Sequence, residues 1–260
     1  MQEGRAEPVV RVRVQAVRGS APREVGASMV VAPHRTLGSV GGGHLEWQAQ
    51  AHARALLNGQ PLPALVRYAL GPNLGQCCGG EVVLEFAVLP SWGQAEATLA
   101  TEAPALQPVA LFGAGHVGRA LVRVLQPLPL RVLWFDSRPD ACGDTPPTQV
   151  PCEQVDPVQD AVADLPASTR VLVMTHSHAQ DLELIAACLQ RQRHSADLPW
   201  IGMIGSATKW ASFRQRLLQR GLDAAALDHV TCPVGVPGIR GKQPEVIAVA
   251  VAAQLLQTLA

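Results

Sequence analysis

The chain is short of aromatic residues and has no excess of charge of either sign. Only 4% of its 260 residues are aromatic, and its 21 Lys and Arg residues are matched by 21 Asp and Glu residues. The balance holds along the chain, with 8 basic and 8 acidic residues before Pro104 and 13 of each after it. Because polyanions select basic patches, we expect no nucleic-acid partner.

Long apolar runs and export signals are missing as well. No stretch reaches the length of about 20 apolar residues that spans a membrane, and the first eight residues lack the basic-then-apolar pattern of a signal peptide. We therefore expect a cytoplasmic protein with no membrane partner. The six cysteines form no C-x-x-C pair, so we expect reduced thiols and no structural zinc site.

The first part of the chain predicts a mixed α+β domain over residues 1–100. Residues 9–17 alternate between Val or Ala and polar side chains, which is typical of a half-buried strand. Further strands are expected at 27–32, 64–69 and 81–88, and the Ala-rich stretch 44–57 indicates a helix. The segment 90–108 has three prolines and no clear period, so it is expected to be a linker.

The remainder predicts a Rossmann-like domain over residues 105–260. Short apolar strands alternate with helical stretches, which favours a parallel sheet covered on both faces. The last helix is apolar nearly all round and is expected to pack between domains or subunits. The expected strands are 109–112, 131–135, 171–175 and 200–204, and the expected helices are 117–125, 156–164, 179–193, 207–220 and 244–259.

A dinucleotide-binding fingerprint lies at the start of this second domain. Gly113, Gly115 and Gly118 form the pattern G-x-G-x-x-G between a strand and a helix. Asp136 ends the next strand, where an acidic residue would bind ribose hydroxyls, and His116 at the helix start would face a ligand. A nicotinamide, a flavin or another phosphate-bearing cofactor would suit this loop, and the alternative is that it only builds the sheet.

Two segments of the first domain suggest an anion site. Gly41, Gly42 and Gly43 precede a helix, where successive N–H groups can form an anion-binding nest, although a flexible turn explains them equally. The turn that contains Ser20 and Arg23 offers a hydroxyl and a guanidinium, which suit phosphate or carboxylate. The alternative for Arg23 is a solvated turn residue.

Adjacent cysteines stand in a glycine-flanked loop. Gln76, Cys77 and Cys78 are followed by Gly79 and Gly80. A disulfide between neighbouring cysteines is strained, whereas a single thiolate suits a soft metal or a sulfur-transfer partner. The alternative is that both cysteines are small buried hydrophobic residues.

Polar residues also follow two later strands. His176 and His178 come after the apolar strand at 171–175, and Gly205 and Ser206 follow the strand at 200–204. Open α/β sheets bind their ligands at the carboxyl ends of the strands. We therefore expect these four residues to contact a ligand, whereas Asp181 is expected to cap the following helix.

Together these segments resemble the XdhC family (XdhC/CoxI type) over nearly the whole chain. The resemblance rests on motifs that occur in the same order. These are Gly19-Ser-Ala-Pro-Arg23, Val40-Gly-Gly-Gly43 with His44 and Glu46, Gln76-Cys-Cys-Gly-Gly80, Phe112-Gly-Ala-Gly-His-Val-Gly118, Asp136-Ser-Arg138, Thr175-His-Ser-His178, Ile204-Gly-Ser206 and Gly241-Lys242.

The resemblance implies an accessory protein rather than an enzyme. Members of the family bind the molybdenum cofactor, hold it while a cysteine desulfurase supplies its sulfur, and insert it into the molybdenum subunit of apo xanthine dehydrogenase. They self-associate, so a homodimer or other homo-oligomer is expected. Cys77 and Cys78 are then candidate contacts of the molybdenum, and NAD or another nucleotide remains a candidate for the Rossmann loop.

Two other classes of function remain open from the residues. An NAD(P)-dependent oxidoreductase would use the fingerprint with Asp136 or Arg138, but apart from His176 and His178 no acid–base pair for hydride transfer is visible. A nucleotide-sensing protein would use the same fold without chemistry, and it has no need of the two cysteines.

Overall fold

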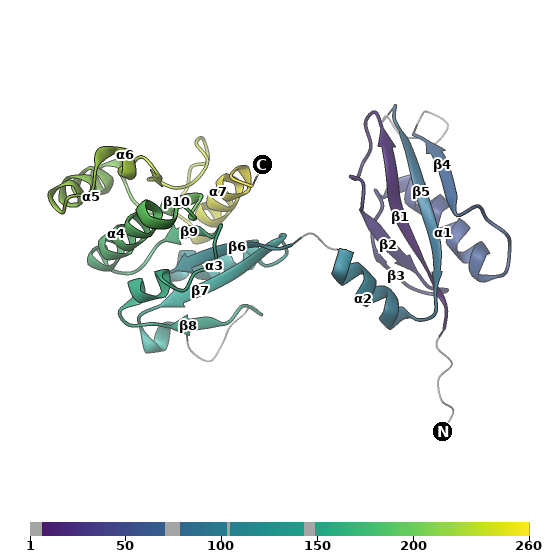
Figure 1. The fold of residues 1–260 in the computed structure, drawn as a ribbon, viewed down its shortest axis with the longest axis horizontal. Helices are drawn as coiled ribbons and strands as arrows, with labels where there is room; N and C mark the ends of the chain where they lie inside the picture. Colours follow the sequence, from purple (N-terminus) through teal and green to yellow (C-terminus); the bar gives the residue numbers. More distant parts are fainter. Residues whose placement is uncertain (1–6, 71–78, 103–104, 143–148, 260) are drawn as a thin grey trace, which may run out of the picture. The chain divides into compact units, whose positions relative to one another are not determined.

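The structure, a computed structural model, forms two compact units (Figure 1). Unit 1 is Met1–Pro104 and unit 2 is Ala105–Ala260. The residues described are 7–70, 79–102, 105–142 and 149–259. Within these ranges no helix is both long enough and apolar enough to cross a membrane.

Unit 1 is an antiparallel sheet with one helix on each face. The strand order is β3-β2-β1-β5-β4. Val10, Val12 and Val14 of β1 point to the face that α1 covers and pack there with Leu45. The elements are β1 (Val9–Arg18), β2 (Ser28–Val31), β3 (Thr36–Gly38), α1 (Gly43–Leu57), β4 (Leu65–Ala69), β5 (Glu81–Leu89) and α2 (Trp92–Glu102).

Helix α2 lies where we expected a linker, so that prediction was wrong. Trp92, Ala95 and Leu99 follow one another at helical spacing and pack on Val9 and its neighbours on the second face of the sheet. This apolar stripe is short and its buried centre is an alanine. The helical period is therefore weak in the sequence, and the flanking prolines led to the prediction of a linker.

Unit 2 is a parallel six-stranded sheet, which confirms the predicted fold class. The order β11-β10-β9-β6-β7-β8 corresponds to the doubly wound Rossmann arrangement. Its first elements are β6 (Gln107–Phe112), α3 (His116–Leu125), β7 (Leu130–Asp136), η2 (Pro139–Cys142), β8 (Cys152–Gln154) and η3 (Val158–Val162). They are followed by β9 (Arg170–Val173), α4 (His178–Ser195), β10 (Trp200–Met203), α5 (Ala207–Gln219), α6 (Ala224–Leu227), β11 (Val230–Thr231) and α7 (Pro244–Gln257).

The last helix, α7, packs within unit 2. Its buried residues, among them Ala248, Val251 and Leu255, join the core under α3. Arg170 at the start of β9 donates hydrogen bonds to the carbonyl oxygen and hydroxyl of Thr258, just beyond α7, at 2.6 and 2.8 Å. We expected this helix between domains or subunits, but packing inside its own unit already accounts for most of its apolar side chains.

Five short elements of unit 2 differ from the sequence prediction. The helix expected at 156–164 is only the 3-10 turn η3, and η2, α6 and strands β8 and β11 were not predicted. Elements this short show no hydrophobic period, and apart from α6 none of the five has the continuous apolar run that indicated β9 and β10. Cys152 in β8 is disulfide-bonded, so the expectation of reduced thiols is wrong for this residue.

Two buried carboxylates hold the loops at the carboxyl edge of this sheet. Asp136, only 1% exposed, accepts hydrogen bonds from the backbone N–H of Ala114 at 2.6 Å and from the backbone and guanidinium of Arg138. Asp181, also 1% exposed, accepts from the backbone N–H and hydroxyl of Thr175 and from the Lys209 ammonium at 2.6 Å. Each acid therefore links segments that follow different strands.

We predict that Asp136→Asn lowers the free energy of unfolding by about 2 kcal/mol at neutral pH. One of the two carboxylate oxygens that accept from Ala114 and Arg138 is replaced by an NH₂ group, which cannot accept, so a donor loses its partner. Burial raises the pKa of Asp136, but the hydrogen bonds from Arg138 and Ala114 outweigh it and hold the pKa below its usual value. A lowered folded-state pKa gives stability that is present above the unfolded pKa and is lost as the pH falls through the folded one.

Urea unfolding at neutral and acidic pH tests this prediction. The difference between the wild type and the variant should shrink in acid, where the wild-type carboxylate is protonated. Asp140→Asn, at an exposed residue with no described side-chain hydrogen bond, is the control. Equal stability of wild type and Asp136→Asn at neutral pH would contradict the structural role of the carboxylate.

Candidate functional site

The fingerprint loop of unit 2 follows β6 and is sterically specified. A Cβ on Gly113 would lie 2.2 Å from the carbonyl oxygen of Met174, and a Cβ on Gly118 would lie 2.1 Å from that of Gly113. Only glycine allows these approaches. Gly115 and His116 at the start of α3 are exposed, and the N-cap Gly115 provides no side-chain hydrogen bond to the helix. The loop therefore has the form that binds a phosphate group.

Asp136 is directed into the protein rather than toward a ligand. Its carboxylate oxygens accept from Ala114 and from Arg138, whose guanidinium binds both oxygens at 2.9 and 3.0 Å. An acid that reads ribose hydroxyls must present free carboxylate lone pairs to the crevice. In this structure Asp136 instead shapes the fingerprint loop, and this weakens the inference of NAD binding from the sequence spacing.

A side-chain bridge crosses above β6. Gln180, in the first turn of α4, donates a hydrogen bond to the hydroxyl of Ser137 at 2.8 Å. Ser137 follows β7 and α4 follows β9, and these two strands flank β6 in the sheet. The bridge therefore spans the position above the strand from which the fingerprint loop emerges, where a bound dinucleotide would lie.

The structure brings four of the predicted residues together in one cavity. His176, His178, Gly205 and Ser206 line an open cavity of about 360 Å³ at the carboxyl ends of β9 and β10. Both imidazoles are exposed, and neither has a hydrogen bond among the described residues. The two histidines follow β9 and the Gly-Ser pair follows β10. They lie together because the carboxyl ends of neighbouring parallel strands meet at the same edge of the sheet.

Lys209 also lines this cavity and was not selected from the sequence. Its side chain is only 12% exposed, and its ammonium donates to Asp181 at 2.6 Å and to the carbonyl oxygen of Ile204 at 3.0 Å. An ammonium has three N–H groups, so one remains for a ligand. Asp181 does not cap α4 as expected, because its carboxylate binds Thr175 and Lys209 instead. The position of Lys209, three residues after Ser206, was the available signal.

Unit 1 has a second site, which we call the glycine junction and define by Gly19, Ser20, Pro22, Gly41 and Gly80. A Cβ on Gly41 would lie 2.4 Å from Cγ of Pro22. A Cβ on Gly80 would lie 2.1 Å from the carbonyl oxygen of Ser20. The Pro22 side chain therefore packs against Gly41, and the backbone of Ser20 packs against Gly80. Three loops that are distant in sequence meet here, as the motif-bearing segments would have to do to form one site.

The expected anion nest in unit 1 already has an internal ligand. One carboxylate oxygen of Glu46 accepts from the N–H groups of Val40 and Gly42 at 3.2 and 3.1 Å, and from the Ser39 hydroxyl at 2.5 Å. Glu46 lies in the first turn of α1, so its side chain reaches back over the loop that begins the helix. An external anion would have to displace Glu46 from these donors.

Two exposed side chains close in sequence to the glycine junction are a cation and an aromatic residue. Arg23 is exposed and pairs with the exposed Glu24, and the pKa of Arg23 is raised by this hydrogen bond and further by the charge of Glu46. Trp47 is 65% exposed, with its ring centroid 5.4 Å from that of His44. Trp47 was missed from the sequence, where an exposed tryptophan cannot be distinguished from a core residue.

The predicted molybdenum contacts cannot be placed. Gln76, Cys77 and Cys78 lie outside the described residues, and the described chain resumes at Gly79. The backbone N–H of Leu70 donates to the carbonyl oxygen of Gly80 at 2.7 Å, so both described ends of that segment lie at the glycine junction. In the described ranges no group of three or more His, Cys, Asp or Glu residues could hold a metal ion.

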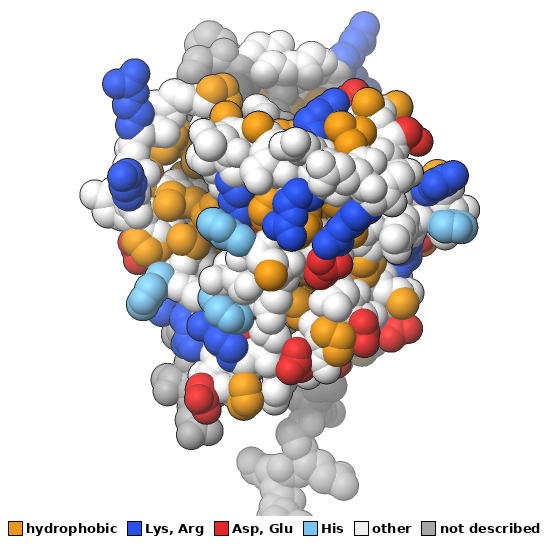
Figure 2. Space-filling view, turned by 90° about the vertical axis from the view of Figure 1, so that its left-hand side faces the viewer, with side chains coloured by type: hydrophobic (Ala, Val, Ile, Leu, Met, Phe, Trp, Pro, Cys, Tyr) orange, Lys and Arg blue, Asp and Glu red, His pale blue; other side chains and the backbone are white. Residues whose placement is uncertain are grey.

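Charged side chains are mixed over the face of the molecule in Figure 2. Lys and Arg are interspersed with Asp, Glu, His and apolar side chains on that face. This distribution agrees with the net charge of zero.

Comparisons with known proteins agree with the two-unit division. The family model described as the XdhC Rossmann domain matches residues 109–255. The model described as the XdhC and CoxI family matches residues 3–69. The two matches together include the fingerprint loop, the cavity at β9 and β10, and the loops of the glycine junction up to Gly41.

Two other proteins are similar to nearly the whole of this chain, which spans less than half the length of the first of them. Uncharacterized protein YqeB of Escherichia coli K12 is 24% identical over 259 residues, which cover 96% of this chain and 43% of YqeB. A Bacillus halodurans crystal structure described as a xanthine dehydrogenase is 22% identical with a TM-score of 0.76 and covers 98% of this chain and 93% of its own. This structural likeness supports the fold, and the family models identify the chain as a member of the XdhC family.

Proposed function

We propose that the chain is an accessory protein that binds the molybdenum cofactor as cargo during the maturation of xanthine dehydrogenase. In this role it holds the cofactor while a cysteine desulfurase supplies the terminal sulfur, and then passes it to the apo molybdenum subunit. Membership of the XdhC family supports the maturation role. The binding of cofactor and the sulfuration step are our extension, as are a cytoplasmic location and a homo-oligomeric state.

The observation that carries the proposal is the convergence at the glycine junction. The turn before Arg23 meets the loop at Gly41 through the side chain of Pro22, and it meets the described end of the Cys77–Cys78 segment through the backbone of Ser20 and Gly80. The cargo combines a flat pterin, a phosphate and an oxo-metal bound by sulfur. The guanidinium of Arg23, the exposed indole of Trp47 and the thiols of Cys77 and Cys78 are of the chemical types that suit these three parts.

A dehydrogenase function receives less support from the geometry. Asp136 is engaged by Ala114 and Arg138, and the Gln180–Ser137 bridge crosses the place of a dinucleotide. The cavity with His176, His178 and Lys209 offers donors for an oxygen-rich ligand but no described pair of groups arranged for hydride chemistry. We therefore assign the Rossmann unit a binding role, in which its fingerprint loop and this cavity take the phosphate or ring portion of a ligand.

The first test is anaerobic titration with molybdenum cofactor, measured as molybdenum retained per chain after desalting. Wild type should retain a stoichiometric amount, and the double variant Cys77→Ala with Cys78→Ala should lose most of it, because thiolates suit the metal. Cys188→Ala, at a free cysteine buried in the core of unit 2, is the control and should bind normally. Absence of molybdenum from the wild type, with NAD bound in a parallel titration, would overturn the proposal.

A second prediction concerns Arg23. Arg23→Ala should weaken cofactor retention by about tenfold, the usual range for a charge-assisted contact with an anion. Arg220→Ala is a matched control, because Arg220 also forms an exposed pair with a carboxylate, Glu183. Equal losses in both variants, or none in Arg23→Ala, would show that Arg23 does not contact the cargo.

A further inference from the structure

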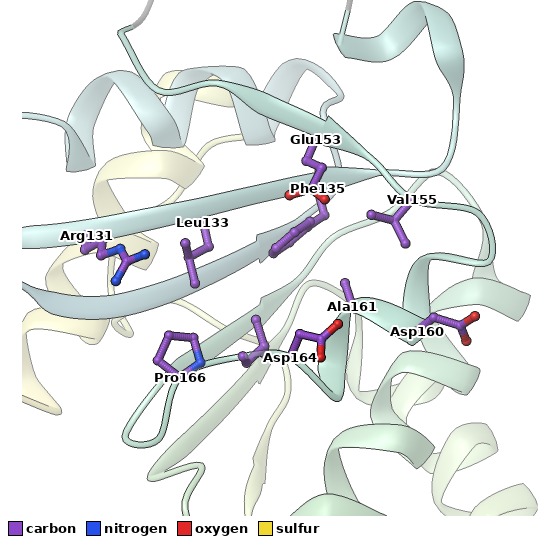
Figure 3. A pocket seen from close by; sticks show the side chains of 10 residues that line it. Arg131, Leu133, Phe135, Glu153, Val155, Asp160, Ala161, Asp164 and Pro166 are labelled. Carbon is purple, nitrogen blue, oxygen red and sulfur yellow. The ribbon is translucent and has the colours of Figure 1, made fainter.

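A cavity of about 360 Å³ lies on the sheet of unit 2 next to its edge (Figure 3). Its floor is apolar: Leu133 and Phe135 come from β7, Val155 follows β8, and Leu165 follows η3. Phe135 is only 8% exposed and Leu165 only 5%, so both form the bottom of the cavity rather than its surface. None of these residues belongs to the sites described above.

The cavity exists because the connection between β8 and β9 is short of helix. The parallel crossover from β9 to β10 contains α4, an 18-residue helix, whereas the crossover from β8 to β9 contains only the five residues of η3. A 3-10 turn of that length covers about 10 Å, against about 27 Å for a helix of the length of α4. Part of the sheet face over β7 is therefore left without a covering helix.

The rim of the cavity is acidic and unpaired. Glu153, Asp160 and Asp164 are exposed, and none of their carboxylates has a hydrogen bond or ion pair in the described part of the chain. Arg131 is the one basic residue of the rim and is likewise without an ion pair there. Three carboxylates against one guanidinium leave an excess of two negative charges around an apolar floor. The complementary occupant therefore has an apolar part for the floor and a positive charge for the rim.

The adjacent sheet edge favours a peptide over a small molecule as the carrier of that group. Strand β8 is the last strand of its sheet and pairs with β7 alone among the described strands. An extended segment can add to such an edge through main-chain hydrogen bonds and place alternate side chains over the sheet face. Glu153 lies on β8 itself, so a side chain of the added segment that is directed to this face meets the acidic rim.

We propose that this cavity docks an extended segment of a protein partner, with an apolar side chain on Leu133 and Phe135 and a Lys or Arg beside the carboxylates. The site is separate from the glycine junction and from the cavity that contains Lys209. It does not depend on the proposed cargo, because it requires only a partner with this local chemistry.

The test uses a random peptide library displayed on phage and selected on the full chain. The library is first depleted on the triple variant Glu153→Lys, Asp160→Lys and Asp164→Lys. Selected peptides should contain an apolar residue next to Lys or Arg and bind wild type at least about tenfold more tightly than the triple variant. Added salt should weaken their binding, because exposed charges are screened.

Two controls keep the result interpretable. Glu245→Lys reverses an exposed acid of α7 outside the cavity and should leave peptide binding unchanged. Leu133→Asp places a carboxylate on the apolar floor and leaves the rim unchanged. It should abolish binding of the same peptides, because their apolar side chain loses its apolar contact. The proposal is overturned if selection yields acidic or uncharged peptides, or peptides that bind wild type and both cavity variants equally.

Discussion

In each unit, a carboxylate of the chain itself binds the N–H groups of a glycine-rich loop. Glu46 accepts from Val40 and Gly42 in unit 1, and Asp136 accepts from Ala114 in unit 2. Glycine loops leave backbone donors without partners in the loop, and such donors need an acceptor when buried. The internal acid supplies one and fixes the loop, so the shape of both candidate sites depends on these bonds. A ligand must therefore use the remaining donors or displace an acid.

The sequence predicted the fold well where an element buries a regular stripe or a continuous apolar run. Alternation along β1 and the apolar strands β6, β9 and β10 determined the sheet of each unit, because one or both faces of these strands are covered. Prediction failed for α2, whose stripe centres on Ala95, and for β8 and η3, which are too short for periodicity. The same short elements create the cavity over Leu133, so the acidic cavity could not have been inferred from the sequence.

Part of the candidate site was also visible in advance. Strand topology placed His176 and Ser206 at one edge of the sheet, and the structure joins them in one cavity. The role of Asp136 was not visible, because sequence spacing locates an acid but does not show that Arg138, two residues later, folds back onto it. Lys209 and Trp47 were missed for a related reason: their importance depends on exposure and on neighbours that only the folded chain provides.

The bonds between Arg170 and Thr258 have a consequence for synthesis of the chain. The core beneath α3 is completed by α7, so the sheet of unit 2 lacks one covering layer until residues near 258 are available. All the elements of unit 1 precede residue 103. On the ribosome, unit 1 can therefore fold while unit 2 is still being made, because domains fold as units in order of synthesis. The apolar face that α7 will cover is the last part of unit 2 to be shielded from water. Chaperones that recognise apolar surface can bind this face until α7 has been made.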